Sequence, residues 1–107
     1  PYHDASFDLV VHSDTLEHVV DPLRALVECR RVLRPGGWLA FTVPIVVGRL
    51  TRKRTTAGPP SYHGPDLVHT EFGADAWTFL LAAGFGSVTI ASRLYPAGLA
   101  LVARRER

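Results

Sequence analysis

The order of its apolar segments constrains what this chain can fold into more than any other feature. A β-branched apolar run precedes an amphipathic helical stretch, which begins at the cap pair Asp21-Pro22 and ends before Pro35-Gly36-Gly37. A second strand, a long irregular segment, a further helix and two strands follow. The expected strands are 7–11, 38–43, 87–92 and 99–103, and the second helix follows Asp75 and ends at Gly84.

Alternation of strands and helices predicts an α/β fold built on a parallel sheet with right-handed crossovers. The last two strands are separated by only about six residues, which is too short for a crossover connection, so they should pair antiparallel. The sequence therefore predicts one domain with a mixed sheet of about four strands.

Residues 45–72 interrupt this pattern. They contain six glycines and prolines and no clear period, and they begin with a basic run of Arg49, Arg52, Lys53 and Arg54. We expect a long loop or insertion there, and loops of this length are commonly functional.

Composition narrows the class of protein. Hydrophobic residues make up 47% and charged residues 21% of the 107 residues, with a net charge of +2, which is typical of a globular domain and not of a disordered chain or a coiled coil. No uncharged stretch is long enough to span a membrane, and no signal peptide is visible. A single cysteine, Cys29, cannot form an internal disulfide, so we expect a soluble, cytoplasmic protein. The chain begins at Pro1, either as a processed product or as a piece of a longer protein.

Five stretches in order resemble a class I S-adenosylmethionine-dependent methyltransferase of the type 11 kind. They are Pro1-Tyr-His-Asp-Ala-Ser-Phe-Asp-Leu-Val-Val, Leu16-Glu17-His18-Val19, Asp21-Pro22-Leu23, Arg31-Val-Leu-Arg-Pro-Gly-Gly-Trp-Leu39 and Ala82-Ala-Gly-Phe85. Each is weak alone, whereas the ordered set is specific, and it covers nearly all of the chain except residues 45–72.

This resemblance implies that residues 1–107 are the C-terminal half of a methyltransferase domain with a partial Rossmann-like fold. The family's sheet has the strand order 3-2-1-4-5-7-6, of which this chain would supply strands 4, 5, 7 and 6, with strand 7 antiparallel. The implied activity is methyl transfer from S-adenosylmethionine to an O, N or C nucleophile of a small-molecule acceptor, without nucleic acid or membrane as partner.

The chain departs from the family in one respect. A glycine-rich turn after a strand, which lets the backbone approach the cofactor closely, is not present in this sequence. We therefore expect this chain alone to be inactive. Two alternatives stay open: a non-catalytic half-domain that acts as a binding or oligomerisation module, and a half-enzyme completed by another chain. The two expected helices would both lie on the same face of the sheet, which leaves the other face and the edge at Phe7–Val11 exposed. We therefore expect self-association through the strand at Phe7–Val11, or dependence on a missing N-terminal segment.

Candidate cofactor contacts follow the first strand. Ligands of open α/β sheets bind beyond the carboxyl ends of strands, and relatives place the segment after strand 4 against the methionine part of the cofactor. His12, Ser13, Asp14 and Leu16 are therefore the candidate cofactor-binding residues. The alternative for Asp14 is that it only caps the following helical turn.

Candidate catalytic and acceptor residues lie further along. His18 is the candidate base, because imidazole titrates near neutrality, with a packed structural histidine as the alternative. In relatives the segment after strand 5 shapes the acceptor pocket, which makes Tyr62, His63, His69 and Glu71 candidate substrate contacts. Their spacing matches no metal pattern, so no metal site is expected.

Other charged and aromatic residues favour structural roles. The basic run from Arg49 to Arg54 is expected to be a solvated loop, with contact to a phosphate of nucleic acid or of a nucleotide-linked substrate as the alternative. The arginines at 104, 105 and 107 are expected to form a solvated tail. Trp38 and Trp77 are expected to be anchors in the core or against a partner.

Overall fold

The computed structural model describes residues 2–54, 62–63, 66–93 and 98–106. Their elements are β1 (Phe7–Ser13), the 3-10 helix η1 (Leu16–His18), α1 (Pro22–Val32), β2 (Leu33–Thr42), β3 (Ile45–Val46), β4 (Arg52–Lys53), β5 (Tyr62–His63), β6 (Asp66–Leu67), β7 (Thr70–Gly73), α2 (Thr78–Ala82), β8 (Thr89–Arg93) and β9 (Gly98–Arg104).

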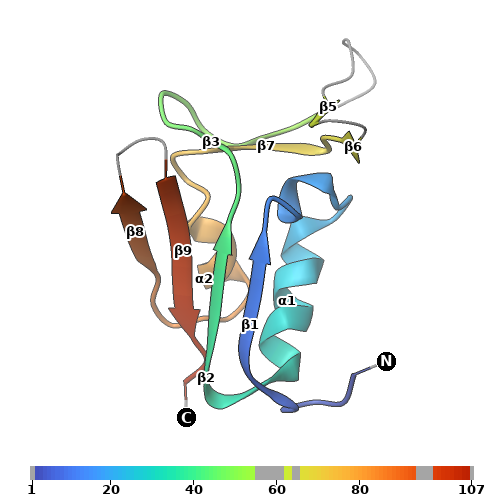
Figure 1. The fold of residues 1–107 in the computed structure, drawn as a ribbon, viewed down its shortest axis with the longest axis vertical. Coiled ribbons are helices and arrows are strands. Elements are labelled where there is room, and N and C mark those ends of the chain that lie inside the picture. The colour runs from blue at the N-terminus through green and yellow to red at the C-terminus, as the bar shows by residue number, and fades with distance from the viewer. Residues whose placement is uncertain (1, 55–61, 64–65, 94–97, 107) are drawn as a thin grey trace.

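The main sheet has four strands in the order β1-β2-β9-β8. β1 pairs parallel with β2, whereas β9 runs antiparallel to both β2 and β8. Figure 1 shows α1 beside this sheet and the last strand of the chain, β9, between β2 and β8. The mixed α/β sheet predicted from the sequence is confirmed, including the antiparallel final pair.

The first long helix begins where the sequence predicts. The Asp21 carboxylate accepts a hydrogen bond from the backbone N–H of Arg24 at 3.1 Å, and Pro22 occupies the first turn. The helix ends at Val32, before Pro35-Gly36-Gly37, as the sequence predicts. These residues lie inside β2, where Gly36 has a φ of +87° and the register against β1 shifts.

The carboxyl end of α1 is instead completed by Arg105. Its guanidinium donates to the carbonyl oxygens of Arg30, Arg31 and Leu33 at 3.2, 3.3 and 2.5 Å, which satisfies groups that no further helical turn can bind. Arg104 lies over the ring of Trp38 at 5.5 Å. The prediction of a solvated tail is therefore wrong for both arginines, because sequence spacing gives no sign of these long-range contacts.

The second helix has the predicted ending. Gly84 adopts a φ of +107°, and the N–H groups of Gly84 and Phe85 donate to the carbonyls of Leu81 and Leu80 at 3.0 and 3.1 Å. Phe85 then folds back into the core, where it is 2% exposed. This cap fixes the direction in which the chain enters β8.

Both helices contribute to one hydrophobic core against one face of the main sheet. Leu26 of α1 and Leu80 of α2 are fully buried against Leu39, Phe41 and Leu101 of the sheet. The expectation that both helices share a face is met. The opposite face, which we call the open face, carries the exposed side chains of β1 and β2. Its largest apolar members are Leu9, Val11 and Trp38, at 57%, 65% and 46% exposure.

The described residues between 45 and 73 build a layer over the ends of β1 and β2. β3 and β4 flank β7 in a three-stranded sheet, which we call the cap sheet, with β3 parallel and β4 antiparallel to β7. In Figure 1 this layer crosses above the tips of β1 and β2. The sequence predicts only a long loop or insertion here, because strands of two to four residues are too short to show a period.

Among the helices that the structure describes, none is long and apolar enough to cross a membrane.

Candidate functional site

A cleft lies where β1 and β2 end beneath the cap sheet. Its volume is about 510 Å3, and its described walls come from the strand ends, the start of β3 and the start of β9. The lining residues are Asp14, Thr42, Val43, Pro44, Ile45, Gly98 and Leu99. Carboxyl ends of parallel strands are the usual binding edge of an α/β sheet, so this cleft is the candidate functional site.

Asp14 holds an unusual backbone conformation at the edge of this cleft. Its φ is +50°, in the left-handed region that aspartate tolerates better than most side chains. No side chain caps η1, whose first residue follows Thr15, so the alternative reading of Asp14 as a helix cap is wrong. The turn instead places Asp14 against the cleft, as strained backbone at functional sites often does.

Short hydrogen bonds join the two strand ends beneath the cleft. The hydroxyl oxygens of Ser13 and Thr42 lie 2.8 Å apart, and the N–H of Asp14 donates to the carbonyl of Thr42 at 3.0 Å. The Ser13 hydroxyl is therefore hydrogen-bonded to Thr42, and the bond from the Asp14 N–H to Thr42 holds the backbone of Asp14 in place.

A second cavity of about 240 Å3 lies between η1 and the cap sheet. Pro44 lines both cavities, which places the two spaces on either side of the segment that leaves β2. Glu17, 1% exposed, the buried Thr70 and Glu71, one of the predicted substrate residues, supply polar groups to the wall, and the other lining residues are apolar. This arrangement is suited to an apolar molecule with one or two polar groups.

His18 connects η1 to the cap region. Its Nδ1 lies 2.9 Å from the carbonyl oxygen of Leu67, so Nδ1 is the donor of that hydrogen bond, and Nε2 lies 3.8 Å from the Glu17 carboxylate. The backbone N–H of His69 donates to the carbonyl of Glu17 at 2.8 Å. The segment before β7 is thus fastened to η1 by two hydrogen bonds.

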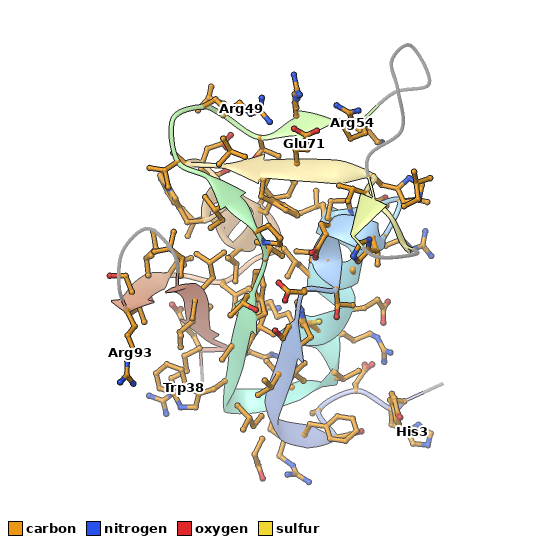
Figure 2. The ribbon with its side chains drawn as sticks, turned by 45° about the horizontal axis from the view of Figure 1, so that its top comes forward. His3, Trp38, Arg49, Arg54, Glu71 and Arg93 are labelled. Carbon is orange, nitrogen blue, oxygen red and sulfur yellow. The ribbon has the colours of Figure 1, made fainter. Side chains whose placement is uncertain are left out.

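Glu71 lies at the centre of an ion cluster on the cap sheet (Figure 2). Arg52 and Arg54 lie 3.1 and 2.9 Å from its carboxylate, and Arg49 contacts the same group. Desolvation acts to raise the pKa of Glu71, but the hydrogen bond and charge of Arg52, with the charges of Arg54 and Arg49, outweigh it and lower the pKa. The sequence does not predict this pairing with Glu71, whereas the side chains of Arg49 and Arg52 are exposed, as expected.

The remaining predicted site residues lie elsewhere. Leu16 is 2% exposed within the core, and its side chain lines neither cavity. Tyr62 and His63 form β5 against β6, but their side chains are outside the described part of the chain. Within that part, no group of three or more His, Cys, Asp or Glu side chains is placed to hold a metal ion.

His12 faces the core side of β1. Its ring stacks on Phe41 at 4.6 Å between centroids, and burial lowers its pKa. The imidazole is thus held in its neutral form beneath the strand end rather than against the cleft.

We expect this histidine to make stability depend on pH. A folded pKa below the unfolded value of 6.5 means that the unfolded chain binds the proton more tightly. The stabilisation is complete above pH 6.5 and is lost as the pH falls toward the lowered pKa. Urea unfolding at pH 7.5 and pH 5.5 should show this decrease, and His12→Phe, which keeps the ring stacking, should reduce it. An unchanged decrease in His12→Phe would contradict the assignment.

Sequence reasoning missed three residues of the site. Thr42 and Pro44 follow the second strand, and the same strand-end rule that selected Ser13 and Asp14 would have found them. Glu17 was passed over in favour of its neighbour His18, because nothing in the sequence shows that the carboxylate is the more buried of the two.

The chain is similar to known methyltransferases in sequence and in fold. Residues 1–41 match the model of a family described as "Methyltransferase domain". A probable S-adenosylmethionine-dependent methyltransferase of Mycolicibacterium smegmatis is 36% identical over 102 residues, 94% of this chain and 37% of that protein. One of Mycobacterium tuberculosis is 38% identical over 92 residues, 84% of this chain and 31% of that protein.

A solved structure shares the fold. The S-adenosylmethionine-dependent methyltransferase from Mesorhizobium loti superposes with a TM-score of 0.70 at 18% identity, over 97% of this chain and 64% of that one. The chain spans about a third of the length of the two mycobacterial relatives. Sequence motifs, sheet order and these relatives agree: the chain belongs to the class I S-adenosylmethionine-dependent methyltransferases.

Proposed function

We propose that this chain supplies the acceptor side of a methyltransferase site, in which a small molecule receives a methyl group on an O, N or C nucleophile. The observation that carries the proposal is the cleft of about 510 Å3 at the carboxyl ends of β1 and β2. Two further observations support the proposal. The family uses S-adenosylmethionine as its methyl donor, and the second cavity, which Pro44 also lines, offers space for an acceptor.

The residues around the cleft suit one end of S-adenosylmethionine. Asp14 offers a carboxylate to the ammonium group of the methionine part, and the Ser13–Thr42 pair offers hydroxyl groups beside it. The chain's own sequence contains no glycine-rich turn for the adenosyl part, so we assign no residue to it. When bound, the cofactor supplies an electrophilic methyl group, and the chain's residues hold donor and acceptor in line.

His18 and Glu17 are the candidates for handling a proton of the acceptor. Nδ1 of His18 is engaged with Leu67, so a proton would be taken at Nε2, beside the Glu17 carboxylate. His69 and Glu71 are not assigned to proton transfer, although Glu71 lines the second cavity and stays a candidate contact of the acceptor. His69 joins η1 to the cap region through its backbone, and the Glu71 carboxylate is held by arginines.

Calorimetric titration with S-adenosylhomocysteine tests the proposal on the chain as it is. Binding in the micromolar range, about −8 kcal/mol, would support the proposal. Asp14→Ala should weaken the binding about tenfold, because a charge-assisted hydrogen bond is lost. Asp8→Ala is the matched control, since it removes a carboxylate from the opposite end of the same strand, and it should leave the affinity unchanged. No binding by a chain that circular dichroism shows to be folded would contradict the proposal for this chain alone.

A second candidate function rests on the open face. β1 is the outer strand of the main sheet, and Leu9, Val11 and Trp38 beside it are exposed. These features favour a half-domain that binds another chain, either as an interaction module or as a half-enzyme that the partner completes. Light scattering, combined with the titration, distinguishes the two candidate functions. A monomer that binds S-adenosylhomocysteine contradicts the half-domain, whereas a dimer that does not bind S-adenosylhomocysteine favours the interaction module.

A further inference from the structure

An arginine cluster on the cap sheet is not used by the proposed methyl transfer. It consists of Arg49, Arg52 and Arg54 around Glu71. We propose that this arginine cluster binds the phosphate group of a small, soluble phosphorylated ligand.

The cluster is built by strand pairing. Arg52 of β4 lies directly opposite Glu71 of β7 in the antiparallel register, so both side chains project from the same face of the cap sheet. Arg49 precedes β4, and Arg54 follows it, with its backbone N–H bonded to the carbonyl of His69 at 2.7 Å. Three guanidinium groups from one short segment are thereby brought to a single point.

The cluster faces outward. Thr70 and Phe72, the neighbours of Glu71 along β7, are buried on the inner face of the cap sheet. Figure 2 shows Arg49, Glu71 and Arg54 together on the outer side of this layer, away from the main sheet. The cluster is thus separate from the cleft, and the inference does not depend on the proposed methyl transfer.

Positive charge is in excess at this point. The guanidinium groups of Arg49 and Arg52 share the single carboxylate of Glu71, and the ion pairs described for these two arginines go only to Glu71. The lowered pKa of Glu71 reflects the same excess. A second anion placed outside the carboxylate would therefore be attracted by the net charge of the cluster.

The arginines also keep donors for such an anion. Each guanidinium has five N–H groups, whereas Arg49 uses Nη2 and Arg52 uses Nε and Nη2 toward Glu71. Their side chains are 42% and 53% exposed. Glu71 holds the guanidinium groups in place, which lowers the entropy cost of binding an oxyanion in the paired geometry that arginine favours.

The shape of the cluster favours one phosphate group over a nucleic-acid backbone. A polynucleotide needs a track of cations, whereas these three converge on one carboxylate. Of the other arginines in the described part, Arg31 and Arg34 pair with Asp4, Asp8 and Glu28 near the amino end of β1. No basic track continues from the cluster in that direction.

The test is a titration with inorganic phosphate at constant ionic strength and pH 7.5, followed by the NMR signals of the arginine Nε–H groups. We expect the signals of Arg49 and Arg52 to shift, with a Kd on the order of 1 mM, and glycerol 3-phosphate to give the same shifts. Arg52→Gln and, separately, Arg49→Gln should each raise the Kd about tenfold. Lys53→Gln removes the same charge from the adjacent residue, which pairs with Thr70, and should change the Kd less than about twofold.

Signal dispersion in each variant shows that it is folded. The inference is overturned if phosphate shifts no arginine signal up to about 20 mM, or if Lys53→Gln weakens binding as much as Arg52→Gln. Binding of a single-stranded oligonucleotide that tightens with its length would also overturn it, since that result indicates a track of contacts rather than one phosphate site.

Discussion

Replacing Phe41 with alanine is expected to lower the free energy of unfolding by about 4 kcal/mol. Phe41 is 2% exposed near the carboxyl end of β2, and its ring packs into the core and stacks on His12 with 4.6 Å between the centroids. Removing it leaves a cavity between the sheet and the two helices that the backbone cannot close. Urea unfolding followed by circular dichroism measures the change, and the dependence on urea concentration should stay the same.

Trp38→Ala is the matched control on the same strand. Trp38 projects from the open face, is 46% exposed and has Arg104 over its ring, so its loss should cost about 1 kcal/mol. A Phe41→Ala cost below about 1 kcal/mol would contradict the core described here. A Trp38→Ala cost equal to that of Phe41→Ala would contradict the exposure of the open face.

Gly73→Ala is expected to lower the free energy of unfolding by about 3 kcal/mol and to open the cap sheet. A Cβ on Gly73 would overlap the carbonyl oxygen of Arg49 and the carbonyl carbon of Leu50, and would lie 2.7 Å from the amide nitrogen of Thr51. These are backbone atoms, which cannot rotate away as a side chain can. They are also held in place, because the N–H of Ala74 donates to the Arg49 carbonyl at 2.8 Å.

Amide hydrogen exchange shows which part of the fold Gly73→Ala destabilises. The amide of Arg54, bonded to His69, and that of His69, bonded to Glu17, should exchange faster, while those of β2 and β9 change less. Gly48→Ala is the matched control, because an added Cβ there meets nothing within 4 Å, and stability should change by less than about 0.5 kcal/mol. Equal effects of the two substitutions would rule out the close backbone approach at Gly73.

The main sheet could be predicted from the sequence because its signals are local. β1 and β9 are continuous apolar runs, and Asp21-Pro22 and Gly84 mark helix ends through hydrogen bonds to residues within a few positions. The short connection before β9 fixes its antiparallel direction. Such features need no knowledge of the rest of the fold.

What could not be predicted depends on residues far apart in the chain. Arg105 caps α1 from more than 70 positions away, and Glu71 meets Arg49 and Arg52 only after β4 and β7 have paired. The candidate site shows the same division. The strand-end rule selected Ser13 and Asp14 beforehand, whereas the burial of Glu17 and the fastening of His18 to Leu67 depend on where the cap region folds.

The central position of β9 has a consequence for how the molecule acquires its structure. β8 pairs only with β9 in the main sheet, and β9 is the last strand of the chain. β1, α1 and β2 are consecutive and can assemble early. The second neighbour of β2 is β9, about 60 residues further along the chain, and closing this long loop has a large entropic cost. Until β9 is in place, the edges of β2 and β8 that it covers stay unpaired. We therefore expect slow refolding in which β8 and β9 are gained together, and aggregation that competes with refolding until β9 has paired.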